Sequence, residues 1–327
     1  AAILCNMMMR TTFLVLAILA VAACDTVDTR RDAPSVSAAD SNAMASTRSA
    51  AYPLIPAAAG IERVNDLVHD PVRDSVTGDA RVAAMVRRGY DIFRNTPTAA
   101  PALTGNGLSC GSCHLNGGQK EGAWPLVGVA TLFPQYRSRP DRFITLEDRI
   151  ADCFARSMNG VPPARDSEEM LAVSAYLTWL ARGLPAGVEP AWRNINDLAE
   201  SALLPIDQLE PDSGRVLYER QCVACHGADG QGVNLGVAHP GPLWGPRSWN
   251  DGAGAARIYT LAGFIRHAMP LTAPGSVSDA DAQHIAAWIN SHDRPAFARK
   301  REDFPRGNVP VDAVYYPQRY TTNPLRR

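Results

Sequence analysis

Two five-residue motifs constrain this chain more than any other feature of its sequence. Each motif has two cysteines separated by two residues and followed at once by a histidine: CGSCH at 110–114 and CVACH at 222–226. Two thiols at this spacing can bond the two vinyl groups of one haem while the adjacent imidazole reaches the iron. A zinc site built from paired cysteines is the alternative, but it does not explain a histidine directly after each pair.

The motifs therefore predict two haem c groups as cofactors. The residues expected to form the thioether bonds are Cys110, Cys113, Cys222 and Cys225. We expect His114 and His226 to be the proximal ligands of the two irons.

The beginning of the sequence is typical of an exported protein. The apolar run from Phe13 to Ala23 is shorter than the ~20 residues of a membrane-spanning helix and fits a secretory signal peptide. It ends in Val-Ala-Ala before Cys24, which resembles a bacterial lipobox; an ordinary signal peptide with a chance cysteine is the alternative. We expect residues 1–23 to be removed and Cys24 to be lipidated, which would anchor the protein on the periplasmic side of a membrane.

Composition and periodicity divide the rest of the chain. Residues 24–60 are rich in Ala, Ser, Thr and Asp and predict a disordered tether. Helical apolar spacing predicts an N-terminal cytochrome c domain at 61–184 and a C-terminal one at 213–296. A proline-containing linker at 185–212 separates them, and a C-terminal extension at 297–327 is expected to lie over them. The predicted fold class is all-α, with two tandem class I cytochrome c-like domains that each carry one covalent haem c.

The two predicted domains repeat one arrangement. A helix precedes each motif, at 80–93 and 213–220, and another closes each domain, at 167–182 and 278–291. Both closing helices begin with a serine that can cap the first turn. This repetition indicates an internal duplication.

A methionine followed by a proline is the predicted distal ligand loop of the second haem. Met269-Pro270 stands after the second motif, and a thioether ligand opposite histidine raises the reduction potential of a haem. His267 is an alternative axial ligand, and packing of Met269 in the core is a further reading.

The first predicted domain has no Met-Pro pair and offers Cys153 instead. Thr145 can cap a helix that ends near Asn159-Gly160. On such a helix Arg149, Cys153 and Ser157 share one face. A cation one turn away stabilises a thiolate, which is both an iron ligand and a nucleophile. A buried, inert cysteine is the alternative.

With these motifs, the sequence resembles the dihaem thiosulfate dehydrogenases, which form tetrathionate. The likeness covers Ala80 to Tyr316. It is carried by CGSCHLNGG at 110–118, LEDRIADCFARSMNG at 146–160, PLWGPRSWNDGAG at 242–254, FIRHAMP at 264–270 and DFPRG at 303–307. The family often has a lysine near its Met-Pro loop, where this chain reads Arg266-His267-Ala268.

The resemblance implies a division of labour between the haems. The haem of the N-terminal domain would be catalytic, with His114 and Cys153 as axial ligands. The haem of the C-terminal domain would transfer electrons and would be ligated by His226 and Met269. The resemblance also implies that Arg149 and Arg139 bind the sulfur oxyanion.

The expected catalytic residues are Cys153, Arg149, Arg139 and Ser157. The expected partners are thiosulfate and tetrathionate, an electron acceptor such as another cytochrome c, and a membrane reached through the lipid anchor. The net charge of −1 gives no sign of a nucleic-acid partner. One alternative is a non-catalytic dihaem electron-transfer lipoprotein or a subunit of a respiratory or photosynthetic complex. Others are a cytochrome that conjugates sulfur to a carrier protein and a dihaem peroxidase, for which the sequence shows no acid–base constellation.

Overall fold

The computed structural model describes residues 54–58, 67–76, 78–236, 240–320 and 322–326. The predicted signal peptide, Cys24 and most of the predicted tether lie outside these residues. Within the described ranges, no helix combines the length and the apolar character needed to cross a bilayer. Residues 54–58 are the described part of the predicted tether. There the prediction of disorder is wrong, because Ile55 is 5% exposed and its backbone N–H donates to the Gln119 carbonyl at 2.9 Å.

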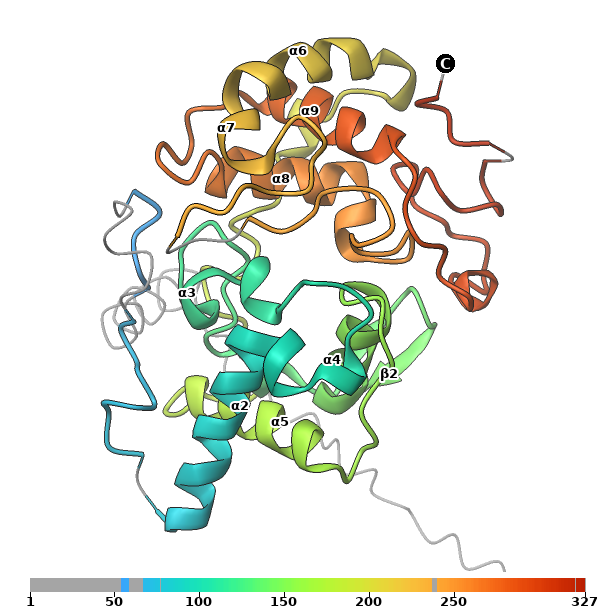
Figure 1. The fold of residues 1–327 in the computed structure, drawn as a ribbon. Coiled ribbons are helices and arrows are strands. Elements are labelled where there is room, and N and C mark those ends of the chain that lie inside the picture. Colours follow the sequence, from blue (N-terminus) through green and yellow to red (C-terminus); the bar gives the residue numbers. More distant parts are fainter. Residues whose placement is uncertain (1–53, 59–66, 77, 237–239, 321, 327) are drawn as a thin grey trace, which may run out of the picture. The chain divides into compact units, whose positions relative to one another are not determined.

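Helices make up most of the regular structure in the described part (Figure 1). They are α2 (Ala80–Ala99), α3 (Leu115–Gly118), α4 (Leu146–Arg156), α5 (Glu168–Leu180), α6 (Pro211–Gln221), α7 (Val223–His226), α8 (Ile258–Ala268) and α9 (Asp279–Ser291). Short 3₁₀ turns cover Pro101–Leu103, Cys110–Ser112, Val129–Leu132, Glu200–Ala202, Ile206–Gln208, Gly254–Ala256 and Lys300–Glu302.

The helix pairs around the two motifs repeat one packing arrangement. Figure 1 shows α2 beside α5, and α6 and α9 also pack together. At the first crossing, a Cβ on Gly89 would stand 1.9 Å from the Ala172 carbonyl oxygen. At the second, a Cβ on Gly214 would stand 1.9 Å from the His284 carbonyl oxygen. Only glycine allows backbones to approach this closely, so a glycine permits close packing of the two helices at both crossings.

Local capping explains where several helices begin. The Ser167 side chain accepts from Met170 N at the start of α5, and Ser278 accepts from Asp281 N at the start of α9. These contacts satisfy amide groups that have no partner inside the helix. The predicted serine caps are therefore confirmed.

One small sheet departs from the all-α prediction. Strands β1 (Gln135–Arg137) and β2 (Arg142–Ile144) pair antiparallel, with Tyr136 opposite Phe143. Three-residue strands are too short to show a clear alternating pattern in sequence. This hairpin matters because it carries arginines towards the first motif.

The predicted linker packs on both predicted cytochrome c domains, the first half of the chain at 61–184 and the second half at 213–296. Trp192 is 7% exposed, and its Nε1 donates to the Val127 carbonyl in the first half at 3.0 Å. Leu204 N donates to Gln283 Oε1 in α9 at 2.8 Å. The segment therefore contributes contacts to both halves.

The C-terminal extension also contacts both halves. Asp303 accepts two hydrogen bonds from Arg156 at the end of α4, at 2.7 and 2.8 Å. Asp312 accepts from Arg257, just before α8, at 2.7 Å. The expectation that this extension lies over the domains agrees with these contacts.

Candidate haem sites

The first motif is held in a tight turn beside α2. Ser109 and Ser112 cap the 3₁₀ turn Cys110–Ser112 reciprocally. Burial, followed by the nearby Cys153, raises the pKa of Cys110 and of Cys113 to about 12. Both thiols are therefore protonated at neutral pH, and Cys153 lies close enough to influence them electrostatically.

The imidazole of His114 is oriented by a backbone carbonyl. His114 Nδ1 lies 2.6 Å from the Trp124 carbonyl oxygen. Since a carbonyl can only accept, Nδ1 must carry the proton and Nε2 keeps its lone pair for a metal. Burial is the main cause that lowers the pKa of His114 to about 4. The ring is therefore neutral at pH 7, as an iron ligand must be.

Helix α4 brings the predicted Arg149, Cys153 and Ser157 to this motif. Thr145 and Asp148 form the expected capping box at its start. Arg149 contributes to the lowered pKa of His114, and Cys153 to the raised pKa of Cys110 and Cys113, so both residues lie near the first motif. Ser157 caps the other end of α4, and its N–H donates to the Cys153 carbonyl at 2.9 Å.

Arginines from three segments gather near Cys153. Burial, then Arg149, Arg193 and Arg139, lower the pKa of Arg137 to about 10, while Cys153 raises it. Burial is the main cause that lowers the pKa of Arg193; Glu189 opposes the shift, and Arg149 adds to it. Within the described part of the chain, neither Arg137 nor Arg149 makes an ion pair or a side-chain hydrogen bond. Arg193 pairs with Glu189 at 3.5 Å, so the positive charge without an acidic partner is that of Arg137 and Arg149.

Arg139 belongs to the edge of this cluster. Its Nη1 donates to the Gly252 carbonyl of the second half at 2.7 Å, and its guanidinium lies 5.7 Å from the centre of the Phe304 ring. Burial lowers its pKa, and Tyr316 opposes this. Arg139 therefore joins the first half to Gly252 in the second half and to Phe304 in the C-terminal extension.

The second motif ends helix α7 and repeats part of this arrangement. Burial lowers the pKa of His226, which favours the neutral ring, and the Gly241 backbone opposes the shift. His226 Nδ1 is buried, yet it makes no hydrogen bond of good geometry to any described residue. Residues 237–239, next to Gly241, are outside the described ranges. Burial also raises the pKa of Cys222 to about 11.

Met269 caps the C-terminus of α8 and is half-buried. It packs against a small cluster of Ala123, Phe264 and Ala268, together with Leu115 and Trp124. His267 is also half-buried, and burial, then Arg266, lower its pKa, so this ring is neutral too. No contact among the described residues joins either side chain to His226, so the choice between them stays a prediction.

The donor chemistry at both motifs fits haem c better than a protein-only metal cage. Among the described residues, no three His, Cys, Asp or Glu side chains gather to hold a metal ion. Each motif instead offers two unpaired thiols and one neutral imidazole, which is the set that a covalent haem needs. The aromatic rings of Phe93 and Tyr176 near His114 supply an apolar surface for a macrocycle.

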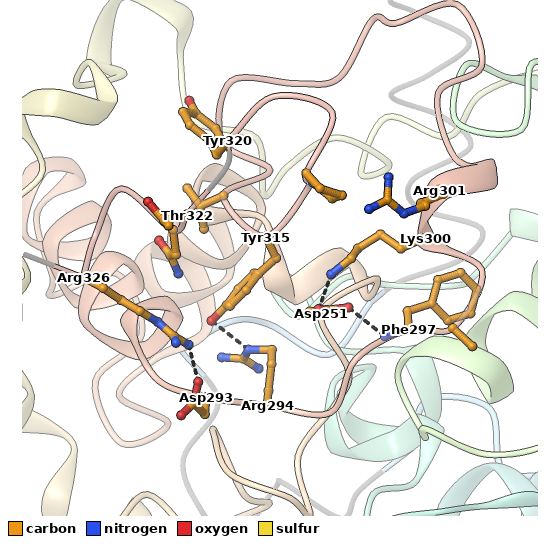
Figure 2. A pocket seen from close by; sticks show the side chains of 14 residues that line it. Asp251, Asp293, Arg294, Phe297, Lys300, Arg301, Tyr315, Tyr320, Thr322 and Arg326 are labelled. Atoms are coloured by element: carbon orange, nitrogen blue, oxygen red, sulfur yellow. Dashed lines mark hydrogen bonds and ion pairs between the residues drawn. The ribbon is translucent and has the colours of Figure 1, made fainter.

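A pocket of about 480 Å³ lies elsewhere, between the second half and the C-terminal extension (Figure 2). Its charged side chains largely pair with each other: Lys300 with Asp251, and Arg326 with Asp293 at 2.6 Å. No cysteine or motif histidine lines it. We therefore place the chemistry at the motifs and not in this pocket.

Three residues near the first motif were not predicted from the sequence. Arg137 is carried by the hairpin, Arg193 by the predicted linker, and Trp124 by the loop after the motif. The left-handed backbone of Trp124, with φ at 46°, has no local signature. Sequence patterns cannot place such residues because the segments meet only in the folded chain.

Two family models match the chain, one around each motif. The model "SoxA/TsdA, cytochrome c domain" matches residues 101–186. The model "Cytochrome C oxidase, cbb3-type, subunit III" matches residues 209–289. Both are cytochrome c domains, and together with the helical structure they show a cytochrome c fold that binds haem c.

Curated relatives and a solved structure agree with each other. Thiosulfate dehydrogenase of Stutzerimonas stutzeri is 42% identical over 212 residues, which cover 64% of this chain and 68% of the relative. That of Allochromatium vinosum is 42% identical over 234 residues, 69% of this chain and 84% of the relative. The structure of thiosulfate dehydrogenase (TsdBA) from Marichromatium purpuratum, as isolated, is 33% identical with a TM-score of 0.65, covering 74% of this chain but only 54% of that one. The chain belongs to the thiosulfate dehydrogenase family of c-type cytochromes.

Proposed function

We propose that this chain is a dihaem c-type cytochrome that oxidises two thiosulfate ions to tetrathionate. The first haem would be held by Cys110, Cys113 and His114, with Cys153 as its distal ligand. The second would be held by Cys222, Cys225 and His226, with Met269 as its distal ligand and His267 as the alternative. When bound, the haems supply two one-electron acceptors, of which the first takes electrons from sulfur and the second delivers them to an external acceptor such as another cytochrome c.

The observation that carries this proposal is the cationic surrounding of Cys153. Arg137, Arg149 and Arg193 act electrostatically on each other or on Cys153 and His114. A cluster of guanidinium groups with few acidic partners is suited to oxyanions, which it can hold by charge-assisted, bidentate hydrogen bonds. A cysteine inside such a cluster is a site where an anionic sulfur compound can meet a sulfur nucleophile.

Electrostatic repulsion explains why the reaction needs this cluster. Two dianions held about 4 Å apart repel each other by ~4 kcal/mol in water, and by ~16 kcal/mol at an effective dielectric constant near 20. An unassisted site could not bring two such ions together. Arg137, Arg149, Arg193 and Arg139 can offset this repulsion because their charges persist at any physiological pH.

Cys153 can divide the coupling into two balanced steps. In the first, its thiolate sulfur bonds to the outer sulfur of one thiosulfate, and two electrons leave. In the second, another thiosulfate attacks that outer sulfur, tetrathionate forms, and the Cys153 thiolate is released. One difficult reaction is thereby replaced by two easier ones. Ser157, one turn further on, can donate a hydrogen bond to an oxyanion held at the same face.

We also propose export and a lipid anchor at Cys24, supported by the apolar run and the small residues before it. Export would place the chain in the compartment where haem c is attached. Radiolabelled fatty acid should label the full-length chain but not a Cys24→Ala variant. Equal labelling of both would refute the anchor.

The decisive assay uses purified holoprotein with thiosulfate and ferricyanide. The proposal predicts thiosulfate-dependent reduction of ferricyanide and one tetrathionate for every two thiosulfate ions consumed. A pure electron carrier would be reduced by dithionite but would not turn over thiosulfate. That outcome would refute the enzymatic proposal and favour the carrier.

A further inference from the structure

Three segments far apart in sequence interlock between the two motifs. The side chain of Asn196, which is 4% exposed, donates to the Gly122 carbonyl and accepts from Trp124 N at 3.2 Å. On the other side, a Cβ on Gly263 in α8 would stand 1.8 Å from the Asn196 carbonyl oxygen. Asn196 therefore contacts the loop 122–124 through its side chain and α8 through its backbone.

The backbone of Trp124 is held in an unfavourable conformation at this junction. Its φ is 46°, in the left-handed region that costs a bulky residue about 1–2 kcal/mol. Such conformations persist only when the surroundings impose them. Here the Asn196 bond fixes the Trp124 amide, and the carbonyl of the same residue is thereby aimed at His114 Nδ1, 2.6 Å away.

The side chain of Trp124 contacts residues of both sites. The centre of its ring lies 6.3 Å from that of the His114 imidazole. The same ring centre lies 4.5 Å from that of Phe264 in α8, which is within the range of a favourable aromatic contact. The ring belongs to the same apolar cluster as Ala268 and Met269. In addition, a Cβ on Gly122 would stand 2.8 Å from the His267 carbonyl oxygen. The loop that orients His114 therefore also supports the end of α8.

We propose that Trp124 is a positioning residue shared by both haem sites. Its carbonyl and its ring both contact the proximal His114, and its ring also packs against the end of α8 from which Met269 extends. Loss of the ring therefore removes a packing contact at each site. This inference rests on the proposed haem ligands, but it does not depend on which substrate is oxidised. It predicts that one side chain controls the redox balance of two haems that are attached more than a hundred residues apart in the chain.

The test compares three variants of the holoprotein by spectroelectrochemical titration. In Trp124→Leu, the ratio of reduced to oxidised haem at a fixed potential should change at least threefold for both haems. In Phe264→Leu, which leaves the carbonyl at His114 in place, only the Met269 haem should change. Trp179→Leu is the matched control, because Trp179 is a buried tryptophan of the first half outside this junction; it should leave the Met269 haem unchanged. Should Trp124→Leu fail to mature, Trp124→Phe keeps a ring and should show smaller changes of both haems.

The outcomes separate this inference from the proposed function. A change confined to one haem in the Trp124 variants would overturn the inference. An equal change of both haems in Trp179→Leu would also overturn it, because the effect would then be a general loss of packing. Because the titration measures equilibrium ratios and not turnover, loss of the thiosulfate assignment would leave a positive result standing. If the near-infrared band of methionine-ligated ferric haem is missing from the unmodified protein, Met269 is not a ligand and the inference fails with that assignment.

Discussion

Replacing Asp303 by asparagine should release the C-terminal extension from α4. The Asp303 carboxylate is 4% exposed and receives two hydrogen bonds from Arg156, at 2.7 and 2.8 Å. Tyr316 donates a third, at 2.6 Å. Burial tends to lower the pKa of Arg156, but the bond to Asp303 and the charge of Asp152 raise it above its ordinary value. Arg156 thus stays charged, and the substitution leaves a buried cation without its main partner.

The structure sets the expected size of this effect. Removing one partner of a buried ion pair costs about 3–5 kcal/mol. Asp152 keeps a contact with Arg156 at 3.2 Å, and asparagine can still accept one hydrogen bond, so we expect the lower end, about 3 kcal/mol. Since each ~1.4 kcal/mol is a factor of ten, this corresponds to about a hundredfold increase in the population of the open extension.

Native-state hydrogen exchange of the holoprotein measures this opening directly. The reporter is the Phe304 amide, which donates to the Arg139 carbonyl at 2.7 Å and should exchange about a hundredfold faster in Asp303→Asn. The control is Arg306→Ala, because the Arg306–Asp141 pair belongs to the same extension but is exposed, and it should exchange like the unmodified protein. An increase below tenfold in Asp303→Asn, or an equal increase in the control, would refute the reasoning.

Three further predictions follow from other parts of the molecule. Arg137→Gln and Arg193→Gln should each raise the KM for thiosulfate roughly tenfold to hundredfold by removing a charge-assisted hydrogen bond, and the haem spectra should not change. The control Arg215→Gln in α6 should leave the KM unaffected. An unchanged KM in the first two variants would show that these arginines do not bind the anion. Gly89→Ala should lower the stability by about 1–3 kcal/mol through overpacking against α5, seen as a lower thermal midpoint, while Gly254→Ala, where an added Cβ meets no atom within 4 Å, should not. Burial, then Arg182, lower the pKa of His69 below its ordinary 6.5, so the unfolded chain binds more protons than the folded one between the two values. The stability of the folded chain should therefore fall as the pH drops below about 6.5. The difference in thermal midpoint between pH 7 and pH 5 should be smaller in His69→Gln than in the unmodified protein. An equal difference in both proteins would show that His69 does not contribute to this pH dependence.

Local signals in the sequence were sufficient for the helices that carry or frame the first site. Thr145 and Asp148 predicted the start of α4 because a capping box involves only neighbouring residues. The serine caps of α5 and α9 were predictable for the same reason. The role of Cys153 was different. The sequence pattern alone did not decide between a buried, inert cysteine and a ligand of the haem iron, and the family resemblance favoured the iron ligand.

Features that depend on distant contacts could not be predicted in this way. Arg193 lies in a segment whose prolines predicted a linker, yet Trp192 packs against the first half and brings Arg193 into the cluster. Trp124 is constrained by Asn196, whose position depends on how the halves pack. The tether prediction failed at Ile55 because this residue pairs with the backbone of Gln119, more than sixty residues away in sequence, and composition does not reveal such a contact.

The rate of thiosulfate-dependent haem reduction in Cys153→Gly shows whether the proposed sulfur chemistry occurs at Cys153. The variant should still carry both haems, since their four attachment cysteines are untouched, and dithionite should reduce them. With thiosulfate, we expect reduction to fall to the background rate, because the proposed nucleophile and distal ligand is gone while the arginines remain. Reduction by thiosulfate at the rate of the unmodified protein would contradict the account.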